Sequence, residues 1–186
     1  MYHTAEFFIE VTEWCEGGSL AKRVDAESDT VEERVACDIA RRVLRGLVHM
    51  HDRHMIHRSV GLSQVMLPEV NSFDGAKLGD FWCVAHVPRD GVVWDPIMPI
   101  YLASAAPEVI TLGRWSDRSD VWAAGCMIFE MLSGHPPFRG TGEELARRIV
   151  HDEPEFDIIC NRTSGSGLDF MRSLLNPSPN LRPTAE

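Results

Sequence analysis

The stretch DVWAAGCMIFEML, running from Asp120 to Leu132, contains the longest apolar segment of this chain. It is apolar on nearly every face, and a helix with that pattern belongs in the centre of a hydrophobic core. The apolar run is interrupted by Glu130 and is shorter than the ~20 residues that a membrane-spanning helix needs. The segment therefore predicts a buried central helix in a globular protein.

A second helix is predicted on the N-terminal side of this segment. Val35, Ile39, Val43 and Leu47 recur every four residues, which predicts a buried stripe on a helix that ends near residue 51. A capping box of Thr30 and Glu33 is predicted at the start of this helix, and a second one, of Thr141 and Glu144, opens another helix. A last helix is predicted at 167–175.

The sequence also predicts strands and a loop. One strand is predicted at 5–14, and two more, at 64–68 and 76–81, are joined by a turn at 69–75. Residues 83–108 are predicted to form a long loop.

Charge and cysteine content exclude several classes of function. The 186 residues include 18 basic and 28 acidic ones, and the net charge of −10 argues against binding to nucleic acid or to an anionic membrane. The five cysteines are scattered and never form a CxxC pair, which favours free thiols in a reducing compartment over disulfides or a zinc site. No signal-peptide pattern opens the sequence, so we predict a cytoplasmic protein.

A metal site formed by histidines is the less favoured interpretation of one local cluster. No cysteine or carboxylate completes a ligand set around His49, His51, His54 and His57.

Six short motifs, in a fixed order over residues 6–186, resemble those of the protein kinase family. The hinge of the family is similar to EWCEGGSL, and its Asp-Phe-Gly motif is similar to KLGDFW. The His-Arg-Asp catalytic loop, with the helix before it, is similar to LVHMHDRHMIHRS. AAPEVI resembles the Ala-Pro-Glu motif, WSDRSDVWAAGCMIFEMLSGHPPF the central helix, and LNPSPNLRPTAE the Arg-Pro-Thr stretch. GGSL and APEVI are similar to serine/threonine kinases, of the NIMA-related or Ste-like kind.

The resemblance implies an α+β, protein-kinase-like fold, namely a mainly helical C-lobe with a small β-hairpin. Residues 1–18 correspond to a remnant of the N-lobe strand and hinge, and the N-lobe is otherwise absent. Residues 19–186 correspond to the C-lobe, truncated at its last helix.

The same resemblance places unusual residues in the catalytic loop. Ser59, Gly61 and Gln64 stand where the family has its catalytic aspartate, a lysine and a magnesium-binding asparagine, after His57 and Arg58. A serine hydroxyl is too weak a base to accept a proton near neutral pH, and glycine carries no charge. Glutamine keeps an amide oxygen but reaches one methylene further than asparagine.

The other nucleotide-site positions are partly kept. Asp80 stands at the second magnesium position, while the glycine that follows Asp-Phe in the family is Trp82, which we expect to pack into the groove where nucleotide would sit. For adenine, the resemblance implies the backbone of Glu13 and Cys15, with Thr12 as gatekeeper and Met66 as the floor. The alternative is that Thr12 and Met66 are simply core residues.

The residues that build the family's fold are present. His57 and Phe81 match the hydrophobic spine, Asp120 matches the aspartate that braces the catalytic loop, and Glu108 with Arg182 matches a buried ion pair.

The segment before Glu108 offers no evident phosphorylation site for Arg58 to bind. Between Asp80 and Glu108, the hydroxyl side chains are Tyr101 and Ser104 alone.

Three functions remain open. The favoured one is a catalytically inactive pseudokinase that acts as a scaffold or regulator. The others are an active serine/threonine kinase that transfers the γ-phosphate of ATP with non-standard residues, and an inert fragment. The cofactors, if any, would be ATP and Mg²⁺, bound weakly or not at all. We expect a protein partner, or self-association through an apolar strand edge at Phe7, Phe8 and Ile9.

Overall fold

The structure is a computed structural model, and it describes residues 2–3, 8–9, 11–26, 30–88, 91–95 and 99–186. Within these residues there are six helices: α1 (Leu20–Ala26), α2 (Glu33–His51), α3 (Pro107–Leu112), α4 (Asp117–Ser133), α5 (Gly142–His151) and α6 (Gly165–Leu174). The strands are short: β1 (Tyr2–His3), β2 (Phe8–Ile9), β3 (Gly18–Ser19), β4 (Met55–Ile56), β5 (Val65–Leu67), β6 (Lys77–Leu78), β7 (Ala85–His86), β8 (Val93–Trp94) and β9 (Arg114–Trp115). The predicted α+β class and mainly helical body are confirmed.

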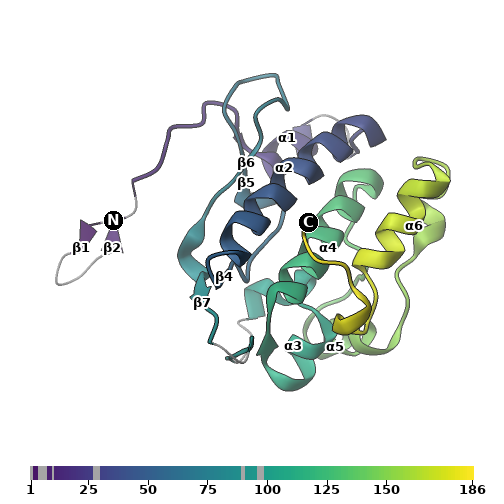
Figure 1. The fold of residues 1–186 in the computed structure, drawn as a ribbon. Coiled ribbons are helices and arrows are strands. Elements are labelled where there is room, and N and C mark those ends of the chain that lie inside the picture. The colour runs from purple at the N-terminus through teal and green to yellow at the C-terminus, as the bar shows by residue number, and fades with distance from the viewer. Residues whose placement is uncertain (1, 4–7, 10, 27–29, 89–90, 96–98) are drawn as a thin grey trace.

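Helix α4 is the centre of the core, as its apolar sequence predicts. Trp122, Met127 and Phe129 on this helix are each no more than 1% exposed. Helices α2 and α6 both pack against α4, and in Figure 1 they lie on either side of it. Burial of this helix on all faces explains why its sequence shows no polar stripe.

The predicted β-hairpin is present, and a third strand extends it. Strands β5 and β6 pair antiparallel, with Met66 opposite Lys77, and β3 pairs with the other edge of β5. Gly17, directly before β3, permits this close approach, because a Cβ on it would lie 2.3 Å from the carbonyl oxygen of Glu69. The remaining antiparallel pairs within the described residues are β1–β2, β4–β7 and β8–β9.

The start of α2 differs from the prediction. The helix begins at Glu33, but its N-cap, Glu32, makes no side-chain cap hydrogen bond. The carboxylate of Glu33 turns instead to the loop before α6, where it accepts hydrogen bonds from the hydroxyls of Thr163 and Ser164 at 2.7 Å. The predicted capping box is therefore wrong, because a contact between distant segments takes the carboxylate that would have formed it.

A second predicted capping box is also absent. Helix α5 begins after Thr141 as expected, but that side chain makes no cap hydrogen bond, and Glu144 pairs with Arg148 at 2.8 Å. A capping box does open α4, where the backbone N–H of Ser116 donates to the hydroxyl of Ser119 at 3.0 Å.

Two further expectations need correction. The segment 83–108 is not a plain loop, because it contains β7, β8, a 3-10 turn at Pro99–Ser104 and the start of α3. Of the strand expected at 5–14, the structure shows β2, while residues 11–15 have no regular structure and residues 5–7 and 10 lie outside the described part. The side chains at the proposed strand edge, Phe7 to Ile9, are also outside it. No helix among the described residues is long and apolar enough to cross a membrane.

Candidate functional site

Asp120 holds the catalytic-loop region in place from the first turn of α4. Its carboxylate is 1% exposed and accepts hydrogen bonds from the backbone N–H groups of His57 and Arg58, both at 2.8 Å. A third contact, at 2.9 Å, joins it to Nε2 of His51 at the end of α2. Two of these contacts involve the backbone, so the loop keeps its shape whatever side chains it carries. Arg58 has a positive φ of 67°, which this bracing stabilises.

The side chain of Ser59 turns inward to His57. Nε2 of His57 donates to the carbonyl oxygen of Gly79 at 3.1 Å, so Nδ1 is the acceptor, and the Ser59 hydroxyl donates to it at 3.2 Å. Burial lowers the pKa of His57, in keeping with this neutral tautomer. Because Ser59 is only 4% exposed, its hydroxyl is a core hydrogen-bond donor and not an accessible nucleophile.

Gln64 forms a hydrogen bond with Asp80, the residue that the family resemblance places at the second magnesium position. The amide nitrogen of Gln64 donates to a carboxylate oxygen of Asp80 at 2.9 Å. The amide oxygen lies near Gly61, since a Cβ built there would be 3.3 Å from it. The glycine thus makes room for the longer glutamine, and the replacements at positions 61 and 64 fit each other sterically.

Arg58 ties together two parts of the segment that follows Asp80. Its Nε donates to the carbonyl oxygen of Cys83 at 2.6 Å, and its Nη1 pairs with the carboxylate of Asp95 at 2.7 Å. The guanidinium also lies 5.6 Å from the ring centre of Trp115. Trp115 in turn donates its indole N–H to the carbonyl oxygen of Asp95 at 2.9 Å. The sequence patterns do not predict Asp95 as a partner, because the resemblance points to a phosphorylated hydroxyl group beside Arg58. The acidic residue in this segment is the signal that could have identified it.

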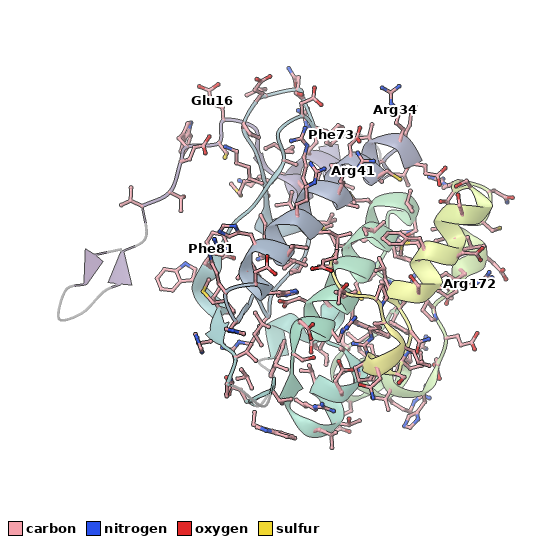
Figure 2. The ribbon with its side chains drawn as sticks, in the orientation of Figure 1. Glu16, Arg34, Arg41, Phe73, Phe81 and Arg172 are labelled. Atoms are coloured by element: carbon pink, nitrogen blue, oxygen red, sulfur yellow. The ribbon has the colours of Figure 1, made fainter. Side chains whose placement is uncertain are left out.

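The aromatic residues beside Asp80 point to different environments. Phe81 packs edge-on against His57 with ring centres 5.5 Å apart, and Figure 2 shows it on the side of the body that faces the N-terminal strands. Trp82 is 63% exposed, so the expectation that it packs into a groove is wrong. The short 3-10 turn at Phe81–Cys83 directs consecutive side chains to different sides, which explains the difference.

The expected adenine-binding residues are only partly brought together. Glu13 forms an ion pair with Lys77 at 2.7 Å, and Lys77 lies opposite Met66 on the neighbouring strand. Directly opposite residues share one face of a sheet, so this ion pair lies on the face that carries Met66. Thr12 is exposed, not a core residue, and Cys15 is half-buried.

A buried ion pair joins α3 to the C-terminal loop. Both Nη atoms of Arg182 donate to the carboxylate of Glu108 at 2.7 Å, with side-chain exposures of 0% and 6%. The guanidinium also lies 4.9 Å from the ring centre of Trp122 in α4. Elsewhere, the described residues contain no group of three His, Cys, Asp or Glu side chains arranged to hold a metal ion.

Comparison with known proteins agrees with the motifs and the fold. The family model for the protein kinase domain matches residues 1–186, and the chain therefore belongs to the protein kinase family. It is 30% identical over 99% of its length to "Serine/threonine-protein kinase 1" of Arabidopsis thaliana, and 30% identical over 95% of its length to "Serine/threonine-protein kinase ATG1a" of the same plant. It is 27% identical over 97% of its length to "Cell division control protein 7" of Schizosaccharomyces pombe. The chain spans 22%, 28% and 16% of these relatives, respectively.

Proposed function

We propose that this protein kinase domain does not transfer phosphate and acts as a pseudokinase, a scaffold or regulator of other proteins. The observation that carries the proposal is the hydrogen bond between Gln64 and Asp80 in a loop that also lacks the family's aspartate and lysine. Together these features remove two parts of the chemistry of phosphoryl transfer.

The first missing part is the base that orients the substrate hydroxyl. In this family an aspartate accepts the proton of the attacking hydroxyl. Ser59 occupies that position, and its own proton is donated to His57 at 3.2 Å inside the core. The hydroxyl is therefore neither basic nor exposed to a substrate.

The second missing part is positive charge at the phosphate. A lysine side chain or a magnesium ion offsets the charge that develops on the transferred group. Gly61 supplies none. The amide N–H of Gln64 faces the carboxylate of Asp80, so metal binding would require the amide to turn its oxygen toward the metal and give up this hydrogen bond. We infer that Mg-ATP binds weakly or not at all.

A direct test measures the transfer of labelled phosphate from Mg-ATP, both to the protein itself and to a mixture of serine and threonine peptides. Native protein is compared with Ser59→Ala and Asp80→Ala variants. We expect the three proteins to give the same background signal. Transfer by native protein above both variants would overturn the proposal.

Nucleotide binding is tested separately by thermal unfolding with and without Mg-ATP. A ligand at 100 times its Kd stabilises a protein by about 2.7 kcal/mol, or a rise in Tm of roughly 5–10 °C at this chain length. We expect a shift well below this size. A shift of that size that disappears in Asp80→Ala would show a working nucleotide site.

A further inference from the structure

A cavity of about 500 Å³ opens between the end of α5, the loop that joins it to α6, and the end of α6. Its floor includes Trp122, Ile149 and Leu175, each no more than 3% exposed. The described lining residues lie between positions 122 and 177, outside the catalytic loop. The volume is that of a ligand site, which typically measures roughly 300–1,000 Å³.

The ends of the chain lie away from this cavity. Ala185 and Glu186 line a separate groove between α2, α4 and α6. Figure 2 shows Arg172, a lining residue of the cavity, on the side of the body opposite to the N-terminal strands. The cavity is therefore bordered by internal segments of the chain.

The wall formed by residues 152–157 is held in place by the core. Phe156 packs edge-on against Phe129 of α4, with ring centres 6.2 Å apart. Its backbone N–H donates to the carbonyl oxygen of Pro154 at 2.8 Å. Ile159, directly after the 3-10 turn at Phe156–Ile158, is fully buried. The wall is thus formed before any ligand arrives, which reduces the entropic cost of binding.

The charged groups of the lining are four carboxylates and one guanidinium. They are Asp152, Glu153, Glu155, Asp157 and Arg172. Asp152 pairs with Arg147 at 3.4 Å, and Arg172 pairs with Asp169 on its own helix at 3.6 Å. No cation among the described residues pairs with the other three carboxylates, which are exposed. Carboxylates around an apolar floor concentrate negative potential in the cavity, which attracts cations.

The floor also carries a hydrogen-bond donor without a partner. The indole N–H of Trp122 has no acceptor among the described residues. Phe138 stacks on the ring with centres 6.0 Å apart, and the Arg182 guanidinium lies 4.9 Å from the ring centre. The indole therefore borders the cavity with its edge, which is where a ring N–H points. A buried donor without an acceptor is destabilising, so a carbonyl oxygen that reaches it favours binding.

We propose that this cavity binds a short arginine-containing segment of a partner protein, with guanidinium groups against its unpaired carboxylates and a main-chain carbonyl oxygen toward the indole N–H of Trp122. An arginine fits both parts of the lining, because its apolar stem packs on the floor while its planar guanidinium pairs with carboxylates. Every residue of the bound segment supplies a carbonyl oxygen. The binding rests on the scaffold role of the pseudokinase and names its class of partner, but its test involves no phosphate transfer, so the two proposals fail separately.

The test uses the chain of residues 1–186 and a set of fluorescent peptides of about eight residues, in which two arginines are separated by different numbers of residues. In the control peptides, both arginines are replaced by citrulline, which has nearly the same shape but no charge. We expect an arginine peptide to bind, and its citrulline counterpart to bind about tenfold more weakly. Equal affinity of the two would overturn the proposal, as would no binding by any arginine peptide at about 1 mM.

Charge reversal on the protein shows whether the carboxylates of the cavity take part. Glu155→Lys should weaken binding of the arginine peptide by about fivefold to tenfold. The matched control is Glu143→Lys, which changes the net charge equally at an exposed position of α5 that does not line the cavity, and it should leave binding unchanged. Both positions are exposed, so neither change should impair folding. Equal effects of the two variants would overturn the proposal.

The indole N–H of Trp122 provides an independent readout by nitrogen-15 NMR. Its signal is assigned by replacing each of the other four tryptophans with phenylalanine in turn. Bound peptide should move this signal downfield, because the N–H gains an acceptor, and should leave the signal of the exposed Trp14 in place. An unchanged Trp122 signal at saturating peptide would overturn the proposal. So would a dimer of the chain alone that Glu155→Lys abolishes, which would make a second copy the occupant.

Discussion

Removal of the Arg182 charge should destabilise the domain more than the loss of an exposed ion pair. The five N–H groups of its guanidinium all donate: two to Glu108, and one each to the carbonyl oxygens of Asn176, Arg118 and Pro177. In an Arg182→Met variant, the buried Glu108 carboxylate keeps, among the described residues, the hydrogen bond from the Ser119 hydroxyl at 3.4 Å. A buried charge left without its partner costs about 3–5 kcal/mol.

This loss is large compared with the stability of a typical domain, about 5–15 kcal/mol. At this chain length it corresponds to a fall in Tm of roughly 6–20 °C. Urea unfolding followed by tryptophan fluorescence measures it directly. The matched control is Arg41→Met, which breaks the exposed pair with Asp38 and should cost less than about 1 kcal/mol. The double variant Glu108→Gln with Arg182→Met should lose less than the sum of the single variants, because neither charge is then left alone.

Equal destabilisation by Arg182→Met and Arg41→Met would refute this reasoning. It would mean that Glu108 regains hydration or protonates at little cost when its partner is removed. The distinction is measurable, because the two expected losses differ by at least about 2 kcal/mol.

Three further predictions concern the loop. Asp120→Ala leaves two backbone N–H groups and the His51 ring without their acceptor. It should lower the free energy of unfolding, measured in urea, by about 3 kcal/mol or more. Asp120→Asn keeps an oxygen acceptor and should lower it less. Burial lowers the pKa of His57 from its ordinary value of 6.5, so as pH falls this residue takes up a proton in the unfolded chain before it does so in the folded one. The free energy of unfolding should therefore decline below about pH 6.5. An equally steep decline in a His57→Gln variant would contradict this. Asp95→Ala releases Arg58 and should speed proteolysis of the segment 83–95 without lowering Tm by more than a few degrees; unchanged cleavage would show that Arg58 does not restrain it.

The helical body could be predicted from sequence because its signals are local. The period of four in α2 and the apolar run of α4 each reflect burial of one element against the core, and both helices lie where expected. The β5–β6 hairpin follows from two short strands and a turn-rich connection. The family motifs added the long-range contacts that no local pattern contains, such as Glu108 with Arg182 across 74 residues.

The errors arise where a side chain chooses a distant partner. Glu33 has the spacing of a capping residue, but it bonds to Thr163 and Ser164, 130 and 131 residues away. Arg58 finds Asp95, 37 residues away, through a segment that shows no periodic pattern. Trp82 was expected to fill a groove because it is large and apolar, yet the backbone turn, and not side-chain size, determines its exposure.

The fold of the catalytic loop and its chemistry depend on different atoms. Asp120 holds the loop through the backbone N–H groups of His57 and Arg58, which every non-proline residue provides. His57 packs on Phe81 and bonds to Gly79 without help from the side chains at positions 61 and 64. The serine, glycine and glutamine at positions 59, 61 and 64 therefore leave these supports unbroken, and the hydroxyl of Ser59 adds a hydrogen bond to the core. A loop held through backbone N–H groups therefore keeps its shape independently of the side chains at these three positions.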